Sequence, residues 1–189
     1  DGAINFQAGL FMQEIEQEFD AYQYAANIGL LAPDPITGNG YDYNKHHYLD
    51  TDVFSAFVAL YWDINDRTEL TVGARYTDEE KDGKIEIPYV HLFLQGSFSA
   101  PPLIDGLEFE DDNISPEIAI NYYLNDDVSV FAAYKEGFKS GGIDNSALPT
   151  ASLSPPDGDF GFLVYQSEEA DGFEVGMKGN FLNDSLRLN

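Results

Sequence analysis

Three histidines and 34 acidic residues are the side chains with the greatest capacity to bind a metal or move a proton. His46 and His47 lie between Asp42 and Asp50, so imidazole and carboxylate ligands occur within one short segment, while His91 stands alone. No spacing among them fixes a coordination geometry. Polar loop chemistry is the stronger interpretation, and we predict no metal site there.

Other carboxylate groups are equally uninformative about chemistry. The segments 111–113 and 157–159 bring oxygens together, but neither follows the spacing of an EF-hand loop, and both suit local turns. The chain contains no nucleophile elbow, no zinc-protease motif and no phosphate-binding glycine loop. We therefore predict no catalytic residue, no cofactor and no enzyme. A glycosidase pair hidden among so many carboxylates is an alternative that the sequence leaves open.

The charge balance excludes further classes of function. With 9 basic residues the chain carries a formal charge of −25, which excludes a nucleic-acid partner because phosphate binding requires clustered Lys and Arg. The absence of cysteine excludes disulfides and thiolate metal sites. At 43% apolar and 14% aromatic residues, the chain has enough material to pack and is no acidic tail.

The elements that position all these residues are strands, because apolar and polar residues alternate with a period of two. In the segment 54–64 every even position is apolar. The same pattern predicts strands at 70–76, 118–124, 128–134 and 173–181, an unpaired strand at 4–12, and a last one at Leu186 and Leu188.

Two kinds of connection separate these strands. The sequence Asn-Asp recurs at 65–66, 125–126 and 183–184, a spacing of about 60 residues that indicates repeated hairpins with tight turns. The opposite connections, roughly residues 20–50, 87–109 and 141–167, have the Pro, Gly and Asp content of long loops. Short turns therefore lie at one end of the strands and long loops at the other.

An apolar stripe of this kind suits either a soluble β-sandwich or a membrane barrel. The stripe lacks charge, while the opposite stripe carries residues such as Glu69 and Glu117. Aromatic residues mark both ends of the stripe, including Trp62 and Tyr76, as in the aromatic girdles of membrane barrels. Together with the unequal connections, these features favour the barrel.

Three segments support this interpretation. Leu70–Lys81, Tyr134–Gly142 and Phe173–Asn189 resemble, in this order, the barrel of TonB-dependent outer-membrane receptors. Two departures are mild: Phe173 stands where such receptors often have Tyr, and Ser167-Glu168-Glu169 replaces a common Pro-Glu pair. No segment resembles a plug, a TonB box or an aromatic-ended terminal strand.

The resemblance implies an all-β fold in which residues 1–189 form one partial barrel domain, about seven antiparallel strands of a larger, 22-stranded barrel. It implies a Gram-negative outer membrane, TonB-dependent uptake of a scarce nutrient with a ferric siderophore as the leading candidate, and lipopolysaccharide as a neighbour. The TonB-ExbB-ExbD complex would act through the missing N-terminal part. The alternatives are a soluble, secreted acidic β-sandwich that binds carbohydrate through its long loops, and a passive porin or adhesin barrel that lacks an internal plug.

Three expectations about sites follow. Charged residues on the polar stripes would face the barrel lumen and contact the plug, or would only pair across strands: these are Arg75, Lys135, Lys139, Glu174 and Lys178. Aromatic residues of the long loops would contact ligand, or would only pack loops together: these are Tyr41, Tyr43, Tyr48, Phe160, Phe162 and Tyr165. Acidic residues near the loops would bind divalent cations that bridge to lipopolysaccharide.

Overall fold

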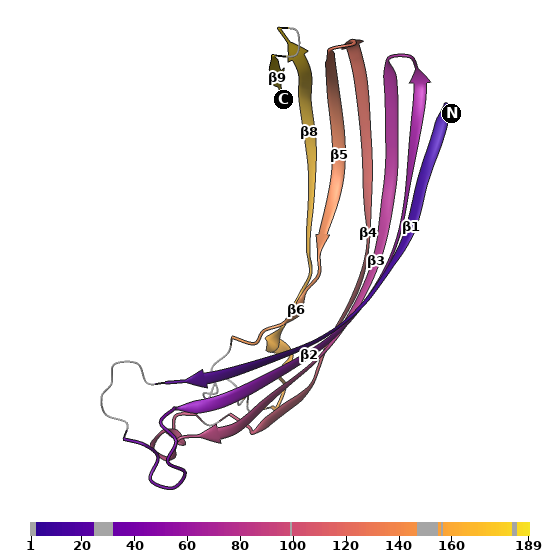
Figure 1. Ribbon diagram of the computed structural model, residues 1–189. Coiled ribbons are helices and arrows are strands. Elements are labelled where there is room, and N and C mark those ends of the chain that lie inside the picture. The colour runs from indigo at the N-terminus through magenta and orange to yellow at the C-terminus, as the bar shows by residue number, and fades with distance from the viewer. Residues whose placement is uncertain (1–2, 25–31, 99, 147–154, 156, 183–184) are drawn as a thin grey trace.

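The computed structural model describes residues 3–24, 32–98, 100–146, 155, 157–182 and 185–189. Its main element is one antiparallel sheet, as predicted, and the order of the strands in the sheet follows the chain (Figure 1). The strands are β1 Ile4–Gln23, β2 Tyr43–Asn65, β3 Thr68–Val90, β4 Leu103–Asn125, β5 Val128–Lys139, β8 Glu168–Phe181 and β9 Leu186–Leu188.

Smaller elements interrupt the connections between these strands. β6 (Gly142–Ile143) pairs with β7 (Val164–Tyr165), and the described residues also contain the short 3-10 turns η1 (Leu92–Leu94) and η3 (Gly161–Leu163). Within the described ranges, no helix is long and apolar enough to cross a membrane.

Two of the three predicted tight turns are confirmed and share one hydrogen-bond pattern. Asn65 Oδ1 accepts from the backbone N–H of Arg67 at 2.9 Å, and Asn125 Oδ1 accepts from that of Asp127 at 2.9 Å. An asparagine that bonds its own backbone two residues ahead stabilises such turns. The third predicted turn falls partly on residues 183–184, outside the described residues.

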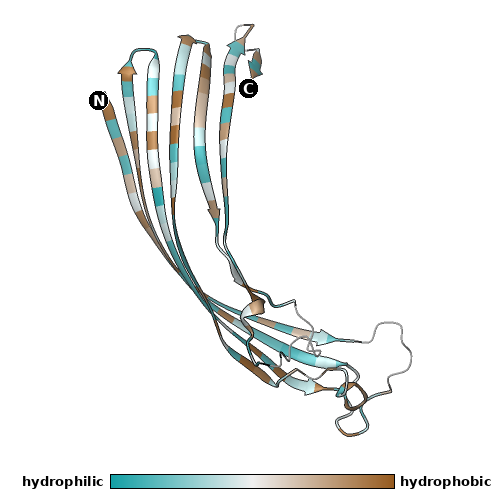
Figure 2. Cartoon of the chain, turned by 180° about the vertical axis from the view of Figure 1, so that it is seen from behind, coloured by the Kyte–Doolittle hydropathy of each residue, from teal (hydrophilic) through white to brown (hydrophobic). Residues whose placement is uncertain are grey.

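The two faces of the sheet differ in the half near the tight turns, the turn half. On one face, here the outer face, large apolar side chains are exposed, with Phe173 and Val175 at 84% and 80%. The bands of alternating hydropathy are visible in Figure 2. The only other sheet among the described residues is the short β6–β7 pair, so no second layer covers this face. The sandwich alternative is therefore wrong.

The strands β1 to β4 are more than twice as long as the segments predicted for them. β2 begins at Tyr43, β3 ends at Val90 and β4 begins at Leu103. The loops predicted at 20–50 and 87–109 are therefore shorter in the structure than predicted. The strand predicted as unpaired, β1, pairs with β2 over its full length. We call this long extension, residues 13–23, 43–53, 77–90 and 103–113, the loop half.

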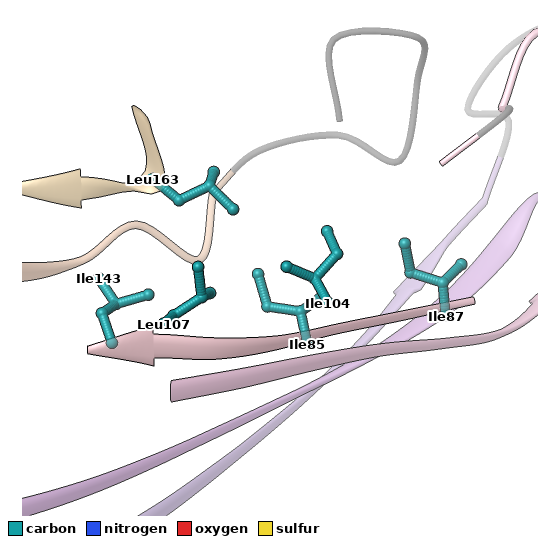
Figure 3. Packing of buried hydrophobic residues seen from close by; sticks show 6 residues of the cluster. All are labelled: Ile85, Ile87, Ile104, Leu107, Ile143 and Leu163. Atoms are coloured by element: carbon teal, nitrogen blue, oxygen red, sulfur yellow. The ribbon is translucent and has the colours of Figure 1, made fainter. Parts of the chain in front are cut away.

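The loop half bends away from the turn half, and the connection after β5 lies in the bend (Figure 1). Four side chains of β3 and β4 point toward this connection (Figure 3): Ile85, Ile87, Ile104 and Leu107. Ile143 and Leu163 of the connection pack on them, and all six are buried. Burying one such side chain stabilises by about 1.5–3 kcal/mol. We call the face that this cluster covers the inner face.

Candidate functional site

The inner face collects most of the positive charge of this acidic chain. Strand register and side-chain contacts place seven of the nine basic residues there: Lys45, Arg75, Lys81, Lys135, Lys139, Lys178 and Arg187. Of the other two, Arg67 lies in a tight turn and Lys84 on the outer face. The same register places seven acidic residues on this face, namely Asp63, Glu69, Glu79, Asp111, Glu117, Glu168 and Glu174. The charges of the inner face therefore nearly balance, although the whole chain is strongly acidic.

Arg75 is held against the wall of the sheet. Its guanidinium donates to Ser55 Oγ at 3.0 Å and to Thr77 Oγ1 at 3.3 Å, and it lies 5.9 Å from the ring centroid of Phe11. Ser55 is fully buried beneath it. These contacts fix the orientation of the guanidinium while leaving the residue exposed at the inner face.

The other predicted lumen residues form a dispersed ladder. Lys135 pairs with Glu117 at 3.3 Å, and Lys139 pairs with Glu168 at 3.4 Å. Both pairs are exposed, so each contributes at most about 1 kcal/mol. Lys178 lies 5.1 Å from the ring centroid of Phe131 on the neighbouring strand.

Glu174 lies opposite Ala133, on the inner face as well. All five predicted residues therefore share one face, but they are spread over β3, β5 and β8 and do not converge on one point.

Lys81 is an inner-face residue that sequence reasoning missed. Its ammonium donates to Ser140 Oγ at 2.9 Å and to the Gly141 carbonyl at 2.6 Å, and it pairs with Glu79 at 2.9 Å. It thereby ties the start of the connection after β5 to β3. The signal was its odd position, which continues the polar stripe of Glu69 to Arg75.

A buried polar group lies further along the inner face. Lys45 donates to the backbone carbonyl of Asn145, and burial lowers the pKa of its ammonium. Burial, followed by the nearby charge of Lys45, also lowers the pKa of His47. Its Nε2 is buried without a hydrogen-bond partner among the described residues. Asp144 lies near Lys45 and His47, and hydrogen bonds from Ser146 lower the pKa of its carboxyl group.

The histidine segment separates onto two faces. Because successive strand residues point to opposite faces, His46 lies on the outer face and His47 on the inner face. Asp50 lies on the outer face, and Asp42 is buried before the start of β2. The structure does not bring these four residues together.

The predicted ligand aromatics also lie in different places. Tyr43 is buried against Phe98, with ring centroids 5.3 Å apart. Tyr48 lies on the outer face, where it stacks on His46. Tyr41 makes edge contacts with Tyr22, Tyr24 and Tyr89 at 5.2, 6.1 and 5.0 Å.

The remaining three aromatics belong to the connection after β5. Phe160 packs against the apolar cluster, and its ring centroid lies 6.5 Å from that of Phe162, which is exposed. Tyr165 is exposed next to Gly142. Only these three share one segment, so the six residues predicted as ligand contacts form no single site.

Asp34 is a second residue that sequence reasoning missed. Its buried carboxylate accepts from the backbone N–H groups of Leu92 and Ile36 at 2.9 and 2.8 Å, and from the Tyr89 hydroxyl at 3.0 Å. These hydrogen bonds, with that of Leu92 first, hold its pKa well below the usual range. The residue joins the connection after β1 to the end of β3.

Comparison with known proteins gives one family. The family model described as TonB dependent receptor-like, beta-barrel, matches residues 2–189. A search of curated protein sequences returns no match.

Two solved structures are similar. The ferric yersiniabactin uptake receptor FyuA from Yersinia pestis aligns with a TM-score of 0.69 at 15% identity, over 96% of this chain and 24% of that one. The alcaligin outer membrane receptor FauA from Bordetella pertussis aligns with a TM-score of 0.49 at 14% identity, over 98% of this chain and 29% of that one. The chain thus spans about a quarter of their length, and the first likeness supports the fold.

Proposed function

Because the chain belongs to the TonB-dependent receptor β-barrel family, we propose that it forms part of the barrel wall of a Gram-negative outer-membrane receptor. The observation that carries this proposal is the apolar band that stands exposed on the outer face of the turn half. In a barrel wall that band contacts lipid, and the polar inner face lines the lumen. The loop half then projects beyond the membrane, because a tilted membrane strand needs only about 9–11 residues.

The transported nutrient in this proposal is a ferric siderophore. The concentration of basic residues on the inner face supports it, since their cationic side chains can interact with anionic ferric chelates. Transport is active and depends on the TonB-ExbB-ExbD complex, which couples the proton gradient of the inner membrane to the receptor. Lipopolysaccharide surrounds the loop half on the cell surface.

Uptake of 55Fe by cells that produce the full-length protein as their only such receptor tests this function. Ferric yersiniabactin, a ferric hydroxamate and a ferric catecholate serve as probes. We expect one of them to accumulate, and a protonophore to abolish its accumulation. Uptake that persists without the proton gradient contradicts active transport and indicates a passive pore.

A matched pair of variants tests the role of the inner face. Lys178→Gln removes a positive charge from the inner face, and Lys84→Gln removes one from the outer face. We expect weaker uptake at low ligand concentration only for Lys178→Gln. Equal loss in both variants contradicts a role for inner-face charge in attracting the ligand.

A further inference from the structure

The outer face of the loop half is strongly acidic. Strand register aligns two rows of four carboxylates across β1 to β4: Glu14, Asp52, Glu80 and Glu110 in one, and Glu16, Asp50, Asp82 and Glu108 in the other. Directly opposite like charges repel each other, so these rows attract cations in general. A general attraction is not a binding site, but it raises the cation concentration at any site nearby.

One group next to these rows contains an imidazole. Register places Asp20 of β1 opposite His46 of β2, and Glu18 lies two residues before Asp20 on the same face. The ligand atoms of the three residues all lie within 4.8 Å of one another, and His46 Nδ1 contacts Asp20 Oδ1. Three candidate ligands from two paired strands are therefore already assembled.

Among the described residues, the one lysine on this face has its own carboxylate partner. Lys84 pairs with Glu86 at 2.8 Å and lies 4.7 Å from the ring centroid of Tyr48. The carboxylate of Glu86 raises the pKa of this ammonium. Glu18 also lines a groove of about 620 Å³, and six of its twelve lining residues carry carboxylates. The group of Glu18, Asp20 and His46 therefore remains open to a cation from solution.

We propose that Glu18, Asp20 and His46 bind a divalent first-row transition-metal ion, of which Zn²⁺ is the type. One imidazole and two carboxylates form a donor set that suits Zn²⁺, whereas Ca²⁺ and Mg²⁺ prefer oxygen alone. Binding bridges β1 to β2 at the cell-surface end of the sheet.

Isothermal titration of the full-length protein in detergent with Zn²⁺, and separately with Mg²⁺, tests the proposal. Removal of a supporting residue around a metal typically costs 10–100-fold in affinity, so we expect His46→Gln and Asp20→Asn to weaken Zn²⁺ binding at this site by at least about tenfold. Mg²⁺ binding should change little in His46→Gln. Asp52→Asn is the matched control, because it removes the same charge as Asp20→Asn from the same face.

Two results overturn the proposal. If Asp52→Asn weakens Zn²⁺ binding as much as Asp20→Asn does, the carboxylate rows attract the ion without a defined site. If His46→Gln leaves Zn²⁺ affinity unchanged, the imidazole is no ligand. Circular dichroism of each variant confirms that it has the strand content of the parent, so that a loss of binding is assigned to the ligands.

Discussion

At the scale of single residues, Asp34 shows how one carboxylate organises a connection. It accepts four hydrogen bonds, three of them from backbone N–H groups that have no strand partner. Ile36 is exposed and Leu92 is half-buried, so each hydrogen bond contributes about 0.5–1.5 kcal/mol. The side chain therefore substitutes for backbone pairing where β1 and β3 have ended.

We expect Asp34→Ala to destabilise this connection by about 1–3 kcal/mol. Hydrogen exchange should accelerate at the amides of Ile36, Thr37 and Leu92. Asp159→Ala, which removes an exposed carboxylate that caps Gly161, is the control and should change exchange only locally. Because the pKa of Asp34 is lowered, its contribution to the stability of the connection is complete above pH 3.8, the ordinary pKa of an aspartate. This contribution is lost as the pH falls below that value and through the lowered pKa. Unchanged exchange at Leu92 contradicts this assignment.

His47 gives a pH dependence in a milder range. Burial lowers its pKa below the ordinary 6.5, so its unfolded form takes up a proton before the folded form does. Lys45 and Asp144 are the charged groups around it. We expect protection of the amides at 142–146 to be complete above pH 6.5 and to fall as the pH drops below that value.

His47→Gln should flatten this pH dependence, whereas His46→Gln on the opposite face should leave it unchanged. Hydrogen exchange measured at several pH values distinguishes the two variants. The same slope in His47→Gln and in the parent protein contradicts the role of His47.

The separation of these two histidines also shows what the sequence predicts at this scale. Alternation predicts that neighbours on a strand point to opposite faces, but residues 43–50 were interpreted as loop. The contact of His46 with Asp20 depends on the register of β1 against β2, which becomes visible only once both strands are paired.

At the scale of elements, two phenylalanines of the inner face cover glycines on the neighbouring strand. Phe57 lies over Gly9, and Phe131 lies over Gly176. A Cβ added at either glycine would lie 2.5 Å from a ring carbon. Aromatic rings that cover glycines in this way protect the backbone and help to fix register.

We expect Gly176→Val to displace the Phe131 ring and to destabilise the pairing of β5 with β8 by about 1–3 kcal/mol. Gly172→Val on the same strand is the matched control, because a Cβ at that position meets nothing within 4 Å. The measurement is thermal unfolding of the full-length protein in detergent. Equal melting temperatures for the two variants contradict the proposed contact.

The carboxylate rows make a second prediction for the elements. Asp82 lies between Asp50 and Glu108, so Asp82→Lys replaces two repulsive pairs with two attractive ones. Each pair contributes about 0.2–1 kcal/mol, and we expect the melting temperature to rise. Asp82→Asn, which only removes repulsion, should give a smaller rise.

High salt should reduce both effects, because ions screen exposed charges. A lower melting temperature for Asp82→Lys at low salt contradicts the repulsion between the rows.

The sequence does not predict the strands of the loop half, because apolar and polar side chains exchange faces between the two halves of the sheet. In the turn half the apolar residues point outward, but in the loop half Ile85 and Leu107 point inward while Asp82 and Glu108 point outward. The period of two persists in Glu14 to Asp20 as alternating charge. An outward apolar stripe therefore predicts strand only up to this inversion, and the polar residues beyond it have the composition of a loop.

At the scale of the whole molecule, the sidedness of the wall is the main testable feature. Val72 lies on the outer face of the turn half and Thr71 on the inner face. In full-length protein in liposomes, we expect a fluorophore on Val72→Cys to be quenched by brominated lipid, and one on Thr71→Cys to be quenched by aqueous iodide. Identical quenching at both positions contradicts the lipid-facing assignment.

The sequence predicts the seven strands, their antiparallel pairing and the two tight turns at 65–66 and 125–126, because period two and Asn-Asp turns are local signals. It predicted neither the apolar cluster of Ile85 and Leu163 nor the anchoring by Lys81. Those contacts join segments about 60 to 80 residues apart, and no local pattern reports them. The siderophore ligand depends on the whole barrel and stays a proposal.

The tight turns do more than reverse the chain. The carbonyl of Arg67 accepts from the N–H of Tyr123 at 2.8 Å, and that of Asp127 accepts from Asn180 at 2.9 Å, so each turn is bonded to the hairpin that follows. Since the order of the strands in the sheet equals their order in the chain, each hairpin pairs with the hairpin that directly precedes it in the sequence. The sheet can then assemble strand by strand along the chain. Each step closes a loop between neighbouring segments, so pairing does not require contacts between distant parts of the sequence.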